Sequence, residues 1–414
     1  MPVNLDDLGR FGRYELSRRI SLGGMAEVFK AKSYGEHGFE KVVALKRILP
    51  TVAESERFQE MFVQEASIAA HLDHPNICRI YELGREGESY YLTMEFIYGH
   101  DVREVLRRCK HLSQPVPSAI VAQIGADVAR ALDHAWRAPD ERGEPLRLVH
   151  RDVSPQNVMI GFDGVVKLID FGIAKVANAS VQTAAGVLKG KYAYMSPEQA
   201  EAKPLDAAAD IWSLGVVLHE LLAGRRLFLG SSVADTIEQI LLSPIPHLDD
   251  APPVLASIVR RALERDVEVR YRSHAEVLGD LDGYLTSLVE PPTPEQVAAF
   301  MDSLFPESTR LESDLSERDV RIVLSAEERG EETTDAKGDL SSATQIFLAD
   351  STGQAEYRAV LEALLARGKL QTRDVSGRAR VAPAASPAPW SVVVWAAASC
   401  FLGALLGLWA LSPL

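Results

Sequence analysis

The sequence predicts an α+β fold in which a small strand-rich lobe precedes a larger helical lobe. In the first ~90 residues, segments such as YELSRRIS, KVVALKRI and YYLTMEF alternate in polarity and are separated by turns. The following ~190 residues carry apolar side chains mostly at helical spacing. Strands followed by helices, rather than strands alternating with helices, are typical of an α+β arrangement.

Composition limits the classes of protein that this chain can belong to. The 414 residues are 47% apolar and 25% charged, which provides for a sizeable core. A net charge of −14 argues against nucleic acid as a partner, because that partner requires a basic face. Cys78, Cys109 and Cys400 lie far apart, which excludes a disulfide framework or a thiolate zinc site and fits a reducing compartment. The first residues, MPVNLDDLGRFGRYEL, contain no apolar stretch, so we expect no cleaved secretory signal.

The strand-rich part contains a glycine turn, a lysine and a glutamate in suggestive settings. Residues 14–32 form two strand-like pieces around Leu22-Gly23-Gly24, and an ordinary hairpin is the alternative to a binding loop. Lys46 lies among apolar residues in the next strand, which favours a position in a cleft over a solvent-facing one. Glu65 lies on the amphipathic helix predicted over 55–72, where a glutamate by default faces solvent.

Two more strands and two helices lead to the centre of the chain. Segments 81–83 and 90–96 flank a turn at Gly87 and end in Ile97-Tyr98-Gly99. Asp101 then precedes the helical segment DVREVLRRC, where it would act as the N-cap. A long helical pattern follows over 116–136.

The stretch from Leu148 to Gly172 carries the most polar chemistry. Asp152 and Asn157 lie in HRDVSPQN, and Asp170 begins DFG. Between them, VMI and VVKLI flank the turn FDG and predict two short strands that hold the two polar loops against each other. An Asp- and Asn-rich hairpin without chemistry is the alternative, and the spacing of the two motifs favours a catalytic arrangement.

The helical lobe continues after a polar segment that is rich in small residues. Residues 173–199 have the composition of a mobile loop and end in Ser196-Pro197-Glu198. Apolar helical patterns follow at 211–224, 232–242, 254–264 and 275–289. We expect Arg270 to pair with Glu198.

Together these motifs resemble a bacterial Hanks-type serine/threonine protein kinase. HRDVSPQN, KGKYAYMSPEQ and GGMAEVF are especially similar to the kinases of myxobacteria and their relatives. The resemblance covers residues 14–289 and implies a two-lobed protein-kinase-like fold there. It also implies transfer of phosphate from ATP to protein substrates, with Mg²⁺, or alternatively Mn²⁺, as the metal. Pro155-Gln156 favours serine and threonine over tyrosine as acceptors.

The resemblance further implies roles for individual residues. Asp152 would accept the substrate proton, Asn157 and Asp170 would hold the metal, and Lys46, oriented by Glu65, would bind the α- and β-phosphates. The ATP site would comprise Ser21, Leu22, Gly23, Gly24, Val28, Lys46, Met94, Glu95, Ile97 and Asp101.

One regulatory role is also implied. Arg151 would pair with a phosphate on Ser180 or Thr183, and the alternative is that both hydroxyls are merely solvated.

A second class of function is a nucleotide-binding scaffold, anchored to a membrane, with little transferase activity. Its support lies in departures from the kinase pattern. Ser21 and Ala26 stand where the first and third glycines of the lid would be, and Ser154 stands where most kinases have lysine.

The C-terminal third does not resemble a kinase. We expect a helical extension over 290–305, then a largely disordered, acidic linker over 306–389 with a short helix near 354–369. Residues 390–411, WSVVVWAAASCFLGALLGLWAL, carry no charge and predict a single transmembrane helix. Arginines at 373, 378 and 380 on its N-terminal side place the kinase domain in the cytoplasm, at the inner membrane.

The predicted membrane span also carries small residues at regular spacing. Ser399, Gly403 and Gly407 form a series that favours a homodimer through this helix. The alternative is that glycine is common in membrane helices.

The sequence predicts that Lys191 replaces a catalytic cation. Ser154 stands at the position where most kinases carry a lysine, and Lys191 stands where they usually carry a threonine. A lysine that points to solvent is the alternative.

If the charge stabilises the transition state, Lys191→Ala will lower kcat by about 10²–10³ with little change in ATP affinity. The double variant Ser154→Lys, Lys191→Thr will recover much of the rate. Parental turnover of Lys191→Ala in a steady-state assay contradicts the prediction.

Overall fold

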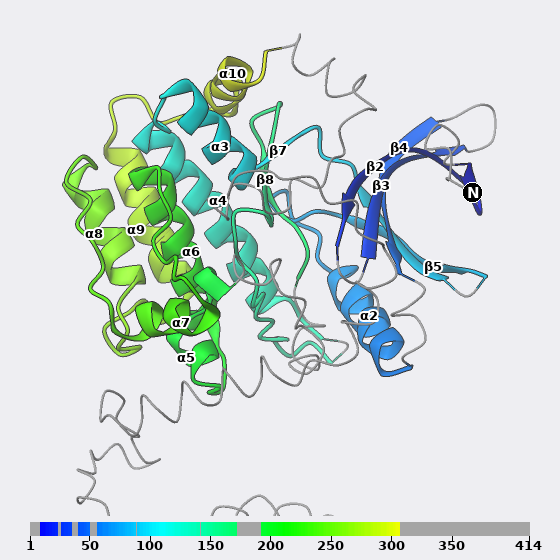
Figure 1. Ribbon diagram of the computed structural model, residues 1–414, viewed down its shortest axis with the longest axis horizontal. Helices are drawn as coiled ribbons and strands as arrows, with labels where there is room; N and C mark the ends of the chain where they lie inside the picture. The colour runs from blue at the N-terminus through cyan, green and yellow to red at the C-terminus, as the bar shows by residue number, and fades with distance from the viewer. Residues whose placement is uncertain are drawn as a thin grey trace, which may run out of the picture. The chain divides into compact units, whose positions relative to one another are not determined.

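A six-stranded antiparallel sheet forms the first lobe (Figure 1). The structure is a computed structural model that describes residues 9–23, 26–34, 40–49, 56–87, 89–140, 142–171 and 192–306. In space the strands follow the order β1-β2-β3-β4-β6-β5. Their bounds are β1 (Arg10–Phe11), β2 (Tyr14–Leu22), β3 (Ala26–Tyr34), β4 (Glu40–Ile48), β5 (Ile80–Glu86) and β6 (Ser89–Glu95).

Strand β4 places Lys46 on the face of the sheet that packs against helix α2 (Glu56–Ala69). Because side chains alternate along a strand, Ala44, Lys46 and Ile48 share one face. Ala44 and Ile48 join a core cluster with Phe62 and Ala66 of α2. Val43 and Leu45 point the other way, into a second cluster. The apolar neighbours of Lys46 in the sequence therefore reflect a strand that is buried on both faces.

A three-stranded sheet, β7-β8-β9, lies between the strand-rich lobe and the helices. Its strands are β7 (Gly99–Asp101), β8 (Val158–Gly161) and β9 (Val166–Leu168). The hairpin β8–β9 is the predicted pair of strands between HRDVSPQN and DFG. Gly99 is required for the close approach of β7 to β8, because a Cβ there would lie 2.0 Å from the Ile160 carbonyl oxygen.

The second lobe is helical and is built around α6, whose residues from Ala207 to Leu221 are all buried. Apolar residues on all sides are typical of a helix in the interior of a domain. Helices α4 and α8 pack against α6, and α9 packs along α4. The helices are α3 (Val102–Leu112), α4 (Ser118–Arg137), α5 (Pro197–Ala200), α6 (Ala207–Ala223), α7 (Val233–Leu242), α8 (Pro253–Ala262), α9 (His274–Ser287) and α10 (Pro294–Leu304), with a 3₁₀ turn at Tyr192–Tyr194.

Side-chain caps fix where most of these helices begin. Asp101, Asp206, Ser232, Ser273 and Thr293 each accept a backbone N–H from the first turn of α3, α6, α7, α9 and α10. The N-cap role expected for Asp101 is therefore confirmed, as is the two-lobed α+β fold. The expected helices are found within a few residues of the expected bounds.

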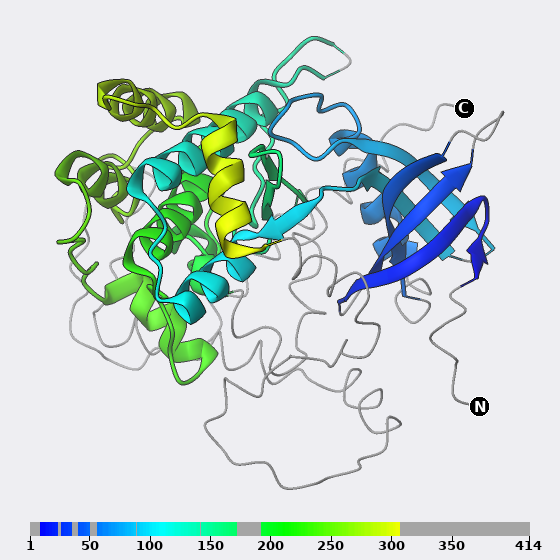
Figure 2. The ribbon, with the colours of Figure 1, turned by 90° about the horizontal axis from the view of Figure 1, so that it is seen from above.

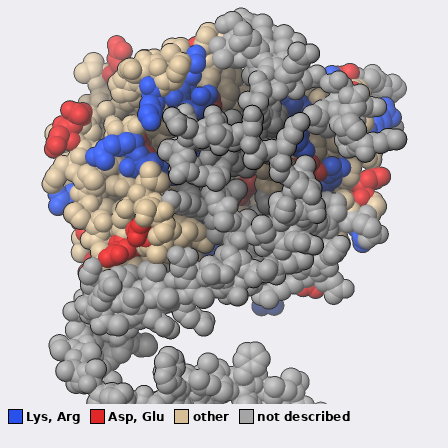
Figure 3. Space-filling model, viewed as in Figure 1, with Lys and Arg blue, Asp and Glu red and all other residues tan. Residues whose placement is uncertain are grey.

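The predicted membrane span, the short helix near 354–369 and the linker lie outside the described residues. Within the described ranges, no helix combines the length and the apolar character needed to cross a bilayer. On the face shown in Figure 3, both basic and acidic side chains occur over the described parts of the surface. Cys78 and Cys109 are buried and free.

The expected pair between Arg270 and Glu198 is confirmed and is buried. The guanidinium of Arg270, whose side chain is 0% exposed, donates to both carboxylate oxygens of Glu198, at 3.1 and 2.9 Å. The same guanidinium donates to the carbonyls of Glu264 and Ala208. Glu198 thus ties the segment after the catalytic loops to the region before α9.

Glu198→Gln will leave a buried guanidinium without its counter-charge and should cost about 3–5 kcal/mol of unfolding free energy. The matched control is Glu268→Gln, which removes the exposed ion pair with Arg272 and should cost less than about 1 kcal/mol. Urea unfolding measures both. Equal losses in the two variants would show that the buried pair has no special role.

Candidate functional site

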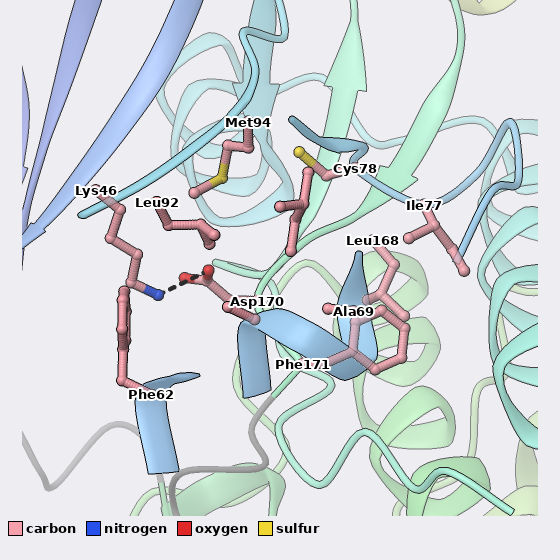
Figure 4. A pocket seen from close by; sticks show the side chains of 12 residues that line it. Lys46, Phe62, Ala69, Ile77, Cys78, Leu92, Met94, Leu168, Asp170 and Phe171 are labelled. Atoms are coloured by element: carbon pink, nitrogen blue, oxygen red, sulfur yellow. Dashed lines mark hydrogen bonds and ion pairs between the residues drawn. The ribbon is translucent and has the colours of Figure 1, made fainter. Parts of the chain in front are cut away.

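The Lys46 ammonium and the Asp170 carboxylate meet at the junction of the two lobes. Nζ of Lys46 donates to Oδ1 of Asp170 at 2.8 Å (Figure 4). Both side chains line a pocket with Phe62 of α2 and Met94 of β6, and Phe171 closes it from the helical lobe. The two residues are 124 positions apart in the sequence, so the fold brings together the predicted phosphate-binding lysine and the predicted metal ligand.

Asp152 and Asn157 face each other across the first polar loop. The Asn157 amide nitrogen donates to the carboxylate Oδ2 and to the backbone carbonyl of Asp152, both at 2.8 Å. The backbone carbonyl of Asn157 accepts from Ile169, directly before Asp170, at 2.9 Å. The three predicted catalytic and metal-binding side chains are therefore attached to neighbouring backbone segments.

His150 connects the two polar loops. Its Nδ1 accepts from the backbone N–H of Asp152 at 3.2 Å, and its Nε2 lies 3.1 Å from the Ile169 carbonyl. These contacts fix the tautomer with the proton on Nε2. The ring also lies against Phe171, with centroids 4.6 Å apart. His150 is 0% exposed, and its two ring nitrogens link the two polar loops from the interior.

Asp210 at the start of α6 holds the backbone before Asp152. Its two carboxylate oxygens accept from the backbone N–H groups of His150, at 2.7 Å, and Arg151, at 2.8 Å. Burial raises the pKa of Asp210 to about 7, although the two backbone hydrogen bonds act to lower it. Arg151 adopts a φ of 66°, a left-handed conformation that non-glycine residues rarely adopt without such support.

Sequence reasoning did not assign a role to Asp210, although a signal was present. Asp210 lies in the first turn of α6 between the apolar stretches AAA and IW, and a carboxylate there has to be paired when the helix is buried. His150 and the ion pair between Lys167 and Glu95, at 3.0 Å, were also missed. The ion pair has no local signal, because it depends on β9 lying beside the end of β6.

Most of the predicted ATP residues lie in strands of the first lobe or directly beside them. Ser21 and Leu22 end β2, Val28 lies in β3, and the Gly23 N–H donates to the Ala26 carbonyl at 2.8 Å to close the turn. Met94 and Glu95 end β6, and Ile97 follows in the segment that leads to β7. Of this set, Lys46 and Met94 line the pocket in Figure 4.

Several predicted residues lie outside what the structure describes. These are Gly24, Ser180, Thr183 and Lys191, together with the side chain of Glu65, whose backbone belongs to α2. The predicted pair between Lys46 and Glu65 therefore stays a prediction. The described partner of Lys46 is Asp170.

The donor set fits Mg²⁺ bound together with a phosphate chain. Asp170 supplies a carboxylate, and Asn157 uses its amide nitrogen toward Asp152, which leaves its amide oxygen for a cation. Hard oxygen donors in small number are what this ion uses beside a nucleotide. In the described ranges, no group of three or more His, Cys, Asp or Glu side chains gathers as a metal site of its own. The phosphate oxygens would complete the coordination.

The arrangement matches that of a known family. A protein kinase domain model matches residues 14–280. The chain belongs to the protein kinase family. It is 40% identical over 302 residues to the tyrosine-protein kinase MasK of Myxococcus xanthus, covering 72% of this chain and 47% of that protein. It is 35% identical over 292 residues to the serine/threonine-protein kinase PknB of Mycolicibacterium smegmatis, covering 68% of this chain and 43% of that one.

Further relatives support the same family. Identity is 34% over 291 residues with the serine/threonine-protein kinase PknA of Mycobacterium tuberculosis, covering 69% of this chain and 64% of PknA. The chain thus spans less than two thirds of the length of each of these three relatives. The crystal structure of the PknI kinase domain of M. tuberculosis superposes with a TM-score of 0.50 at 27% identity, covering 66% of this chain and 97% of that one.

The burial of Asp101 at the start of α3 predicts a pH dependence of stability. Its carboxylate accepts from the Glu104 N–H at 2.7 Å, and burial raises its pKa to about 6. A raised carboxylate pKa means that the folded state binds more protons than the unfolded state between about pH 4 and 6, so stability falls as pH rises through this window.

Asp101→Asn keeps the cap and removes the titration. The unfolding free energy of the parent should therefore fall relative to that of Asp101→Asn as pH rises from 4 to 6. Above pH 7 the difference between the two should be constant. Urea titrations at several pH values measure this difference. A difference in unfolding free energy that stays constant from pH 4 to 7 contradicts the raised pKa of Asp101.

Proposed function

We propose that the chain transfers the γ-phosphoryl group of ATP to serine and threonine hydroxyls of proteins. The observation that carries the proposal is the meeting of Lys46 and Asp170 at 2.8 Å beside the hydrogen-bonded pair of Asp152 and Asn157. Membership of the protein kinase family supports it. In the reaction, the substrate oxygen forms a bond to the γ-phosphorus, and the bond from that phosphorus to the oxygen shared with the β-phosphate breaks, which releases ADP.

Each of these residues has a role that its position supports. Asp152 orients the substrate hydroxyl and accepts its proton, and the Asn157 amide holds the Asp152 carboxylate in place. Lys46 binds the α- and β-phosphates, with Glu65 proposed to orient it. Asn157 and Asp170 would hold the metal, which supplies positive charge to the phosphates when it is bound. Asp101 is proposed to contact the ribose.

The second candidate is transfer to tyrosine. The observation in its favour is the 40% identity with a protein named a tyrosine-protein kinase. Phosphoamino-acid analysis of the labelled products separates the two. Phosphoserine and phosphothreonine support the first proposal, and phosphotyrosine alone supports the second.

Arg151 supports a proposal for regulation through a phosphate on Ser180 or Thr183. Its guanidinium Nε is buried and has no hydrogen-bond partner among the residues that the structure describes. Its backbone is held on both sides, because its N–H donates to Asp210 and its carbonyl accepts from Gln199 at 3.0 Å. A guanidinium whose Nε has no partner among the described residues, on a backbone held from both sides, suits a phosphate as its partner.

For the rest of the chain, we propose that residues 390–411 anchor the protein in the inner membrane as a single span with the kinase domain in the cytoplasm. The support is the uncharged sequence of this segment and the arginines before it. Association of two copies through Ser399, Gly403 and Gly407 would allow one kinase domain to phosphorylate the other.

The direct test is transfer of ³²P from labelled ATP to a general protein substrate and to the chain itself. Asp152→Asn should lower kcat by about 10²–10⁴, because it removes the proton acceptor. Lys46→Met should lower kcat/KM strongly while the protein stays folded. Asp250→Asn, at an exposed position of a surface loop, is the matched control and should leave the rate unchanged. A folded parent protein that binds ATP without turnover supports the scaffold reading and contradicts the proposal.

A further inference from the structure

Helix α10 lies beyond the residues that the family model matches, yet it packs against the nucleotide side of the domain. The match ends at residue 280, and α10 spans Pro294–Leu304. A capping box formed by Thr293 and Gln296 fixes its start. Figures 1 and 2 both show α10 in yellow beside α3, which begins directly after Asp101. Its buried side chains are Val297, Phe300, Met301 and Leu304.

The beginning of α10 contacts the β8–β9 hairpin, which connects the two polar loops of the site. Gly164 forms the turn between β8 and β9 with a φ of 81°. A Cβ on Gly164 would lie 1.8 Å from the Pro294 carbonyl oxygen, so the two backbones are in direct contact. The hairpin lies between Asn157 and Asp170 in the sequence. This contact therefore attaches α10 to the segment that joins the two metal-binding residues.

The end of α10 is fastened to the segment that leads to Asp101. The Leu304 carbonyl accepts from Nε of Arg108 on α3 at 2.8 Å. Phe305, 3% exposed, stacks on the His100 ring with centroids 3.9 Å apart and an angle of 27°. Phe162 meets the His100 ring edge-on at 5.6 Å and completes the aromatic group.

His100 is the central residue of β7. It pairs with Ile160 of β8 and is followed directly by Asp101. The carbonyl of Tyr98, just before β7, accepts from the Phe162 N–H at 2.8 Å. The aromatic group of His100, Phe162 and Phe305 thus fixes the short strand between the end of β6 and the N-cap of α3. Asp101, which directly follows His100 in this strand, is the residue proposed to contact the ribose of ATP.

We propose that Phe305 is a positioning residue for ATP, acting through His100 on the strand that carries Asp101. The proposal rests on the proposed function, since it concerns the affinity of the same site for its nucleotide. A phenylalanine that only filled the core would affect stability alone. A positioning residue affects the affinity for ATP, while the rate of the bound complex stays the same because Asp152, Asn157 and Lys46 belong to other segments, the catalytic loop and β4.

The experiment measures KM and kcat for ATP, together with the Kd for ATP by direct titration, in the full chain. Phe305→Leu keeps the residue apolar and removes the ring, and His100→Ala removes its partner. Each should raise KM and Kd about 2- to 10-fold with kcat unchanged, in line with the usual strength of an aromatic pair. The double variant should be no worse than His100→Ala alone, because Phe305 acts through the ring that His100→Ala removes. His100→Phe keeps the stack and should retain parental values.

The matched control is Tyr284→Leu, which removes a buried aromatic ring from α9 in the helical core. It should lower the melting temperature without changing KM. Unchanged KM and Kd in Phe305→Leu and His100→Ala overturn the positioning role, as does an equal change in Tyr284→Leu. If the parent chain does not transfer phosphate, the proposed function fails, and the Kd values still decide whether Phe305 positions the nucleotide.

Discussion

The two hydrogen bonds from the His150 and Arg151 backbone to the Asp210 carboxylate are the constraint on which the site depends. They join the loop that carries Asp152 to α6, the most deeply buried helix of the domain. A carboxylate in such a position is costly unless both of its oxygens are paired, and here two consecutive N–H groups pair them. These two bonds hold the backbone of Arg151 in a left-handed conformation, and the side chain of the next residue, Asp152, accepts a hydrogen bond from Asn157. The fold of this region and its proposed catalytic role therefore rest on the same pair of bonds.

From Asp210 on α6, a short series of contacts extends to the first lobe. His150 links the loop to Ile169, and Asn157 does the same through its carbonyl, so Asp170 has a fixed place relative to Asp152. Asp170 then meets Lys46, which the alternation of β4 directs toward α2 and the pocket. Two further links join the lobes behind this pair, the Lys167–Glu95 ion pair and the bridge between Ile77 and Leu168. The geometry needed for phosphoryl transfer is thus assembled from interactions of both lobes.

The sequence predicted the features that depend on local pattern. The apolar neighbours of Lys46 favoured a position in a cleft, and Lys46 lines the pocket. The motif HRDVSPQN with DFG located the two polar loops. Helix bounds were found to within a few residues, because Ser, Thr and Asp caps have a local signature. The pair of Glu198 and Arg270 was expected from opposite charges at motif positions, and the structure confirms it.

Features that depend on long-range packing were not predicted. The contact between Lys46 and Asp170 joins residues 124 positions apart, and the sequence had assigned Asp170 to the metal alone. The strand β7 has only three residues, Gly99–Asp101, too short for a pattern, and it exists because β8 pairs with it. The rings of Phe305 and His100 stack although the two residues are about 200 positions apart in the sequence, and no periodic pattern of side chains predicts such a contact. The role of Asp210 had a compositional signal, but its partners are backbone atoms and leave no trace in the sequence.

The measurement that tests this account most directly is the turnover of Asp210→Asn. An amide can accept only one of the two backbone N–H groups well, because its nitrogen is itself a donor. The catalytic loop should then lose its fixed conformation, and kcat should fall by about 10²-fold or more while ATP affinity changes little. A folded Asp210→Asn protein that phosphorylates its substrate at the parental rate would show that the loop does not depend on Asp210, and would contradict the central claim.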